Sequence, residues 1–159
     1  LFCVKEVLAV VSSRLARDAH ADFQTVSEAI FNRLQGELET QVSLRAASEI
    51  KFQLNMFNEK QKGAAALKAA LQSLANGIDI DAIYSQTLTA FNQVLSAKDY
   101  EGLLALYNRK SLSAQASGAL GLANGELPEL VVRLAKGDSR DEVSDALRKY
   151  FGSFAVHIA

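Results

Sequence analysis

A four-residue apolar repeat between Phe23 and Phe57 constrains the fold of this chain more than any other feature; this stretch is called the spine below. It contains no proline, and a step of four residues advances about 400° around a helix of about 3.6 residues per turn. The apolar stripe therefore drifts by about 40° per step, which one neighbouring helix could not cover. We expect one long helix, or two collinear ones, with the stripe in the core along its whole length and different neighbours at the two ends. The stripe consists of Val26, Ile30, Leu34, Leu38, Val42, Ala46, Ile50 and Leu54.

The rest of the chain consists of shorter amphipathic segments without sustained two-residue alternation. Glycine and β-branched or hydroxyl residues weaken helix interiors, so the spine is expected to break, if anywhere, at Gly36 or within 40–43. The sequence thus predicts an all-α, multi-helix domain of about eight helices around one long central helix. The shorter helices are expected at 2–17, 64–75, 80–97, 100–108, 112–122, 127–135 and 140–151.

Capping residues mark several of these boundaries. Asp79 and Asp99 each precede a predicted helix, where a carboxylate can accept a hydrogen bond from a free backbone N–H. A Ser or Thr followed three residues later by Glu is typical of a capping box, which begins a helix. The chain has two such pairs, Thr25 with Glu28 and Ser139 with Glu142. For the first pair the alternative is that the spine already starts near Asp22.

Composition excludes some classes of function. Nearly half of the 159 residues are apolar and 22% are charged, which is ordinary for a folded soluble protein with one core. The net charge of −1 argues against nucleic-acid or membrane binding driven by the overall field. No apolar run approaches the roughly 18 residues of a membrane span, and no signal peptide is visible. We therefore expect no membrane partner.

The first residues of the chain bear on its redox compartment and on whether it belongs to a longer protein. Cys3 is the single cysteine, which excludes an internal disulfide and fits a reducing, cytoplasmic compartment. Its apolar neighbours predict a core residue rather than a reactive thiol. The chain opens within apolar sequence, at 1–4, so we interpret residues 1–159 as a single helical domain that forms part of a longer protein.

Catalytic and metal-binding patterns are weak. His20 and His157 are far apart in sequence and neither accompanies a nucleophile pattern. Asp79 and Asp81 are the nearest approach to a Mg²⁺ pair, but they follow a predicted helix end instead of a buried strand. We expect Asp79 to cap a helix and Asp81 to offset its dipole. No catalytic, cofactor-binding or metal-ligating residue is assigned.

Two basic clusters are the candidate contact residues. Basic groups near helix ends usually complement the helix dipole, but they can also bind phosphate, and an aromatic residue beside them is compatible with RNA contact. Both alternatives stay open: a helix junction, or contact with nucleic acid or a partner protein. The residues concerned are Lys60, Lys62, Tyr107, Asn108, Arg109 and Lys110.

The second cluster lies in the stretch 98–112, KDYEGLLALYNRKSL, which resembles a known family. An acidic cap, a short leucine-rich helix, Tyr-Asn, a basic pair and an apolar residue follow one another in it. This order is similar to the C-terminal helical half of bacterial TOPRIM-type nuclease effectors, which pair with ABC-type ATPases in anti-phage defence. The matching residues are Asp99, Leu103, Leu104, Tyr107, Asn108, Arg109, Lys110 and Leu112.

The resemblance implies a regulatory or docking half of a toxin effector, which dimerises or binds its ATPase partner. Metal-dependent cleavage of RNA, including tRNA, would then belong to an upstream domain that holds Mg²⁺. The family's strand-borne glutamate and Asp-x-Asp pair are absent from 1–159, so this span itself is expected to be no enzyme. The alternative is a stand-alone helical adaptor that only binds other proteins.

Overall fold

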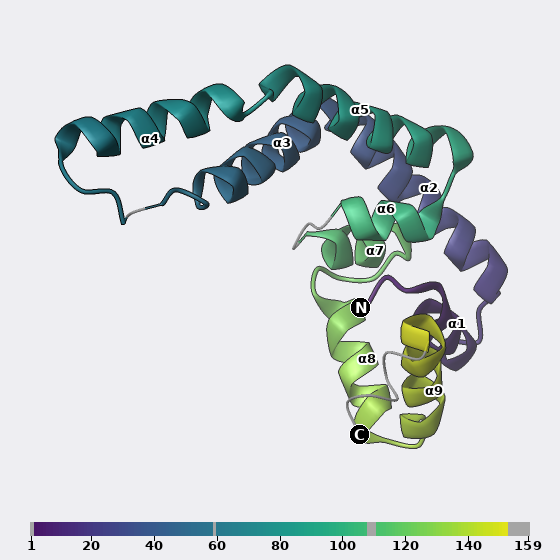
Figure 1. Ribbon diagram of the computed structural model, residues 1–159. Helices are drawn as coiled ribbons and strands as arrows, with labels where there is room; N and C mark the ends of the chain where they lie inside the picture. Colours follow the sequence, from purple (N-terminus) through teal and green to yellow (C-terminus); the bar gives the residue numbers. More distant parts are fainter. Residues whose placement is uncertain (1, 59, 108–110, 153–159) are drawn as a thin grey trace. The chain divides into compact units, whose positions relative to one another are not determined.

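The computed structural model describes residues 2–58, 60–107 and 111–152, and these form α-helices joined by turns (Figure 1). They contain no strand, so the predicted all-α, multi-helix class is confirmed. No helix in this part of the chain is both long enough and apolar enough to cross a lipid bilayer. The helices are α1 (Lys5–Arg14), α2 (Ala19–Gly36), α3 (Leu38–Leu54), α4 (Ala64–Gly77), α5 (Ile80–Ala97), α6 (Tyr100–Leu106), α7 (Leu112–Ala119), α8 (Glu126–Lys136) and α9 (Arg140–Phe151).

The chain forms two compact units, and the boundary between them falls within α2. The first unit contains Leu1–Arg33 and Asn108–Ala159, and the second contains Leu34–Tyr107. In the first unit α1 packs against α8 and α9, while α8 also contacts α7 and α9. In the second unit α5 packs against α3 and α6. The expectation of a single domain stays a prediction, because compactness does not say whether the units unfold separately.

The spine is two helices that meet at Glu37. Glu37 has φ −114° and ψ 9°, outside the α-helical range, so the chain breaks directly after Gly36 as its weak helix propensity predicts. The stripe is fully buried at Ile30, while Leu54 at the other end is 40% exposed. The expectation that the whole stripe is core is therefore wrong at its C-terminal end.

The core of the second unit closes around Tyr107, which is fully buried. Its hydroxyl donates a hydrogen bond to Glu37 Oε2 at 3.0 Å, so the residue after α6 is tied to the break in the spine. A buried phenol needs such a partner for its polar end. Other apolar side chains buried in this unit are Leu34, Val42, Ala46, Phe91, Val94, Tyr100 and Leu103.

The two carboxylate caps lie where the sequence predicts them, but the two predicted capping boxes do not form. Asp79 Oδ1 accepts a hydrogen bond from Ala82 N at 2.9 Å, and Asp99 Oδ1 accepts one from Gly102 N at 3.0 Å. Ser139 makes no side-chain cap, so that box is wrong.

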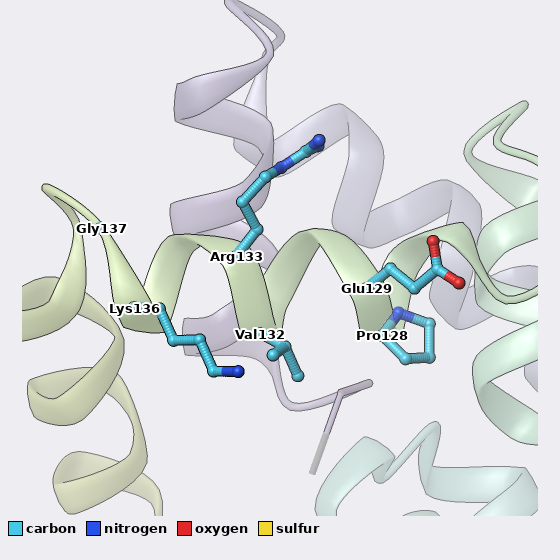
Figure 2. Close-up of a pocket in the computed structure, with 6 residues that line it drawn as sticks. All are labelled: Pro128, Glu129, Val132, Arg133, Lys136 and Gly137. Atoms are coloured by element: carbon cyan, nitrogen blue, oxygen red, sulfur yellow. The ribbon is translucent and has the colours of Figure 1, made fainter.

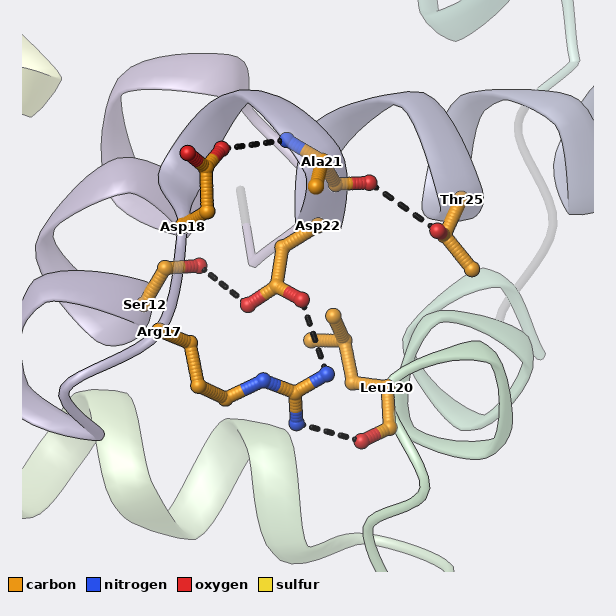
Figure 3. A network of polar contacts seen from close by, with 7 residues as sticks. All are labelled: Ser12, Arg17, Asp18, Ala21, Asp22, Thr25 and Leu120. Atoms are coloured by element: carbon orange, nitrogen blue, oxygen red, sulfur yellow. Dashed lines mark hydrogen bonds and ion pairs between the residues drawn. The ribbon is translucent and has the colours of Figure 1, made fainter.

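The other predicted box is also wrong, because Thr25 lies inside α2. Its hydroxyl donates to Ala21 O at 2.9 Å, a bond to the preceding helical turn. Asp18, the residue before α2, caps the helix instead, since its Oδ1 accepts a hydrogen bond from Ala21 N at 2.7 Å (Figure 3).

A polar network centred on Asp22 holds the first unit together (Figure 3). Asp22 is 7% exposed, and its Oδ2 accepts a hydrogen bond of 2.7 Å from the buried Ser12 hydroxyl on α1. Its Oδ1 lies 2.7 Å from Arg17 Nη2, while Arg17 Nη1 donates to Leu120 O at 2.7 Å. Because buried carboxylates need such partners, the network fixes α1, the start of α2 and the end of α7 in one arrangement.

Candidate docking surface

Helix α4 in the second unit packs against no other helix closely, and none of its residues is buried. The segment is helical because alanine and leucine, the strongest helix formers, occupy most of it. Its larger apolar side chains, Leu67 and Leu71, are 37% and 51% exposed. The helix therefore has an apolar face that the described part of the chain does not cover.

The end of α3 leaves apolar groups uncovered as well. Phe52 is 59% exposed, and Met56, just beyond the helix, is 63% exposed. Single exposed apolar residues are normal on a protein surface, whereas a contiguous cluster marks an interaction site. Whether these side chains cluster depends on how α4 lies against α3.

Helix α4 runs alongside α3 in Figure 1. A groove of about 350 Å³ is lined by residues from the C-terminal ends of both. We call it the α3–α4 groove. Phe52 and Met56 line one wall at a spacing of four residues, and Leu74 and Ile78 line the other at the same spacing. Gln53 Nε2 donates a hydrogen bond to Glu49 Oε1 at 3.1 Å on the α3 side. The described residues that line it are Glu49, Phe52, Gln53, Met56, Ser73, Leu74, Gly77 and Ile78.

A second hollow, of about 560 Å³, lies on α8 in the first unit (Figure 2). Within the described part of the chain, successive turns of this one helix and the glycine that ends it supply its lining. Ligand sites usually enclose most of a ligand between several elements, which one helix face cannot do. The lining residues are Pro128, Glu129, Val132, Arg133, Lys136 and Gly137.

The residues predicted from the basic clusters are separated by the fold. Lys60 and Lys62 lie exposed on the loop that connects α3 to α4. Tyr107 is core, as the helix-junction alternative predicts for it. Asn108, Arg109 and Lys110 lie outside the described residues, so their part in either alternative stays a prediction.

The remaining candidates have structural roles or stand alone. Asp79 caps α5 as predicted, and Asp81 is exposed in the first turn of that helix. His20 is exposed in the first turn of α2. Burial raises the pKa of the Cys3 thiol to about 11, so the thiol stays protonated at neutral pH. Within the described residues, no group of three or more His, Cys, Asp or Glu could hold a metal ion.

The docking residues on α3 and α4 were not predicted from the sequence. Phe52 and Met56 lie off the spine's stripe, so the four-residue repeat did not select them. Leu67, Leu71 and Leu74 follow helical spacing, but the same spacing is found on helices that face a core. Comparisons with protein-family models, with curated proteins and with solved structures gave no match.

Proposed function

We propose that this chain is a helical docking module that binds a partner protein through the α3–α4 groove. The observation that carries the proposal is the lack of any buried residue on α4. Isolated helices shorter than about 15 residues are marginal in water, and packing of an amphipathic face supplies most of their stability in proteins. Helix α4 has 14 residues and a leucine-containing face without such packing, so a partner that covers this face would stabilise it.

The groove fits docking better than small-molecule chemistry. Its walls are mostly apolar, and among the described residues Glu49 is the one ionisable side chain in its lining. General acid–base or metal chemistry needs several convergent ionisable groups. Binding of another protein needs apolar anchors within a polar rim, which Phe52, Met56 and Leu74 supply beside Gln53.

The test places a photo-crosslinking amino acid at Phe52 or Leu71 of the full chain in its source cells. The crosslinked protein is then purified, and its affinity for the chain is measured. We expect Phe52→Ser and Leu71→Ser each to weaken binding at least tenfold, as interface anchors do. Phe151→Ser is the matched control, since Phe151 is 44% exposed on α9 of the other unit. Equal effects at Phe52 and Phe151, or no crosslink at either Phe52 or Leu71, would refute the proposal.

A finer hypothesis names the longer protein and its partner. The stretch Lys98–Leu112 supports it through its resemblance to TOPRIM-type nuclease effectors, in which an ABC-type ATPase is the partner. On this hypothesis the chain is the docking half of an anti-phage nuclease, and the alternative is a stand-alone adaptor. Reading the gene upstream of the Leu1 codon distinguishes the two. Strand-rich sequence with a Glu and a later Asp-x-Asp favours the nuclease, and a nearby start codon favours the adaptor.

A further inference from the structure

We infer that the partner presents an acidic amphipathic helix to the α3–α4 groove. The inference rests on the proposed docking function and adds the chemistry of the partner. Helix-in-groove recognition uses apolar anchors at helical spacing on one side of the incoming helix. The two walls of the groove offer such a helix two rows, Phe52 with Met56 and Leu74 with Ile78.

Charge decides which kind of helix fits. Residues 44–77 contain five basic residues and two acidic ones, a net charge of +3. The chain has 17 basic and 18 acidic residues in all, so the other 125 residues hold 12 basic and 16 acidic, a net charge of −4. This segment, which ends just before the groove's Ile78 and the exposed Asp79 and Asp81, is therefore a positive stretch of an acidic chain. Its basic residues are Arg45, Lys51, Lys60, Lys62 and Lys68.

These five basic side chains are available to a partner. All five residues are exposed, and no acidic group of the described residues lies within ion-pair distance of them. One carboxylate, Glu49, does line the groove, and the amide of Gln53 donates a hydrogen bond to it. None of the five is in the described lining of the groove, but exposed basic groups on α3, on α4 and on the loop between them attract an acidic partner and repel a basic one.

Two other occupants fit these observations less well. A second copy of the chain would bring two segments of charge +3 together, which like-charge repulsion disfavours. A membrane-surface helix usually carries many Lys or Arg residues on its polar face. Helix α4 has one, Lys68, and the apolar groups of the groove line a hollow instead of a ridge.

The experiment selects binders to the full chain from a phage-displayed library of helical peptides. Each peptide has about 18 residues, enough to form a helix, with leucine at i, i+3, i+4 and i+7 and with Glu, Lys, Gln or Ala elsewhere. We expect the selected peptides to be strongly acidic. Their affinity should fall at least tenfold with Phe52→Ser or Met56→Ser, both at exposed positions that leave the fold intact, as circular dichroism will verify.

Charge variants test the electrostatic part separately. Replacing Lys51, Lys60, Lys62 and Lys68 together with Gln should weaken acidic peptides about tenfold at low salt and flatten their salt dependence. The matched control replaces Arg133, Lys136, Arg148 and Lys149 of the other unit with Gln and should change little.

Every other result overturns the inference. Neutral or basic peptides that still need Phe52 would refute the acidic helix but leave docking at the groove. The same holds if a second copy of the chain, or a vesicle rich in anionic lipid, binds in place of peptide and loses binding with Phe52→Ser. If nothing binds in a way that depends on Phe52 and no groove crosslink forms in cells, the docking function fails too.

Discussion

Replacing Asp22 with alanine tests whether the polar network holds the first unit together. The carboxylate accepts a 2.7 Å hydrogen bond from Ser12 and forms a 2.7 Å ion pair with Arg17. Asp22→Ala removes both acceptors but leaves the bond from Arg17 to Leu120 O in place. The loss should therefore fall mainly on the link between α1 and the start of α2.

The size of the effect follows from the burial of each partner. Ser12 is fully buried, and an unsatisfied buried hydroxyl costs about 1–3 kcal/mol; a bond to a carbonyl in the preceding turn of α1 would bring this toward the lower value. The Arg17 side chain is 38% exposed, so water replaces its lost partner and the cost is at most about 1 kcal/mol. The higher helix propensity of alanine offsets roughly 0.5 kcal/mol of this destabilisation. The net destabilisation should be about 2 kcal/mol.

Urea denaturation followed by far-UV circular dichroism measures this change. For a chain of this length, about 2 kcal/mol should also lower Tm by roughly 5 °C. The matched control is Asp145→Ala, which breaks the exposed pair with Arg148 and should cost less than about 0.5 kcal/mol. In a double-mutant cycle with Ser12→Ala, the coupling energy should be about 1 kcal/mol. Asp22→Ala as stable as Asp145→Ala, or a coupling of zero, would show that the network does not hold α1 to α2.

Three further predictions concern single side chains. Tyr107→Phe removes the hydroxyl bond to Glu37 and should destabilise the chain by about 1 kcal/mol in urea; no change would mean that the bond adds nothing. Gly102→Ala should also destabilise by about 1 kcal/mol despite alanine's helix propensity, because the new Cβ would overlap the Asp99 cap, and a stabilised variant would contradict this. The Cys3 thiol is neutral in the folded chain, whereas the unfolded chain's thiol ionises at about pH 8.5. The contribution of Cys3 to the free energy of unfolding should therefore be complete below about pH 8.5 and be lost as pH rises through about 11. Cys3→Ala should lack this pH dependence, and fast thiol labelling of the folded chain at pH 8 would refute the burial.

Local sequence rules predicted the helices well where a single residue sets a boundary. Helix α5 spans Ile80–Ala97 as expected, because Asp79 supplies a carboxylate at its first free N–H groups. The rules failed where tertiary contacts decide. Ser139 and Thr25 both have the spacing of a capping box, yet α2 begins earlier, at Ala19, and Ser139 is buried without capping α9. Spacing alone does not reveal which of several nearby polar residues begins a helix.

The candidate site was harder to predict because the sequence does not distinguish a buried apolar row from an exposed one. Leu67, Leu71 and Leu74 on α4 have the spacing of a core face, although α4 has no buried residue. Lys60 and Lys62 were selected for their charge, and they lie on the loop that joins the two walls of the groove. The anchors beside them, Phe52 and Met56, follow no long repeat. Burial is a property of what packs against a helix, and a single sequence does not specify that.

The drift of the stripe gives a physical reason for its last residue to be exposed at this end of the spine. A four-residue repeat rotates around its helix, so each part of the stripe needs a different neighbour. Val42 and Ala46 have one in α5 and are buried, whereas Leu54 is 40% exposed. The neighbour that the last turn of α3 requires is thus incomplete within the described residues. A partner helix in the α3–α4 groove would cover Phe52 and Met56, which lie on another side of α3 than Leu54. Phe52 should therefore gain protection from solvent when the partner binds, and Leu54 should not.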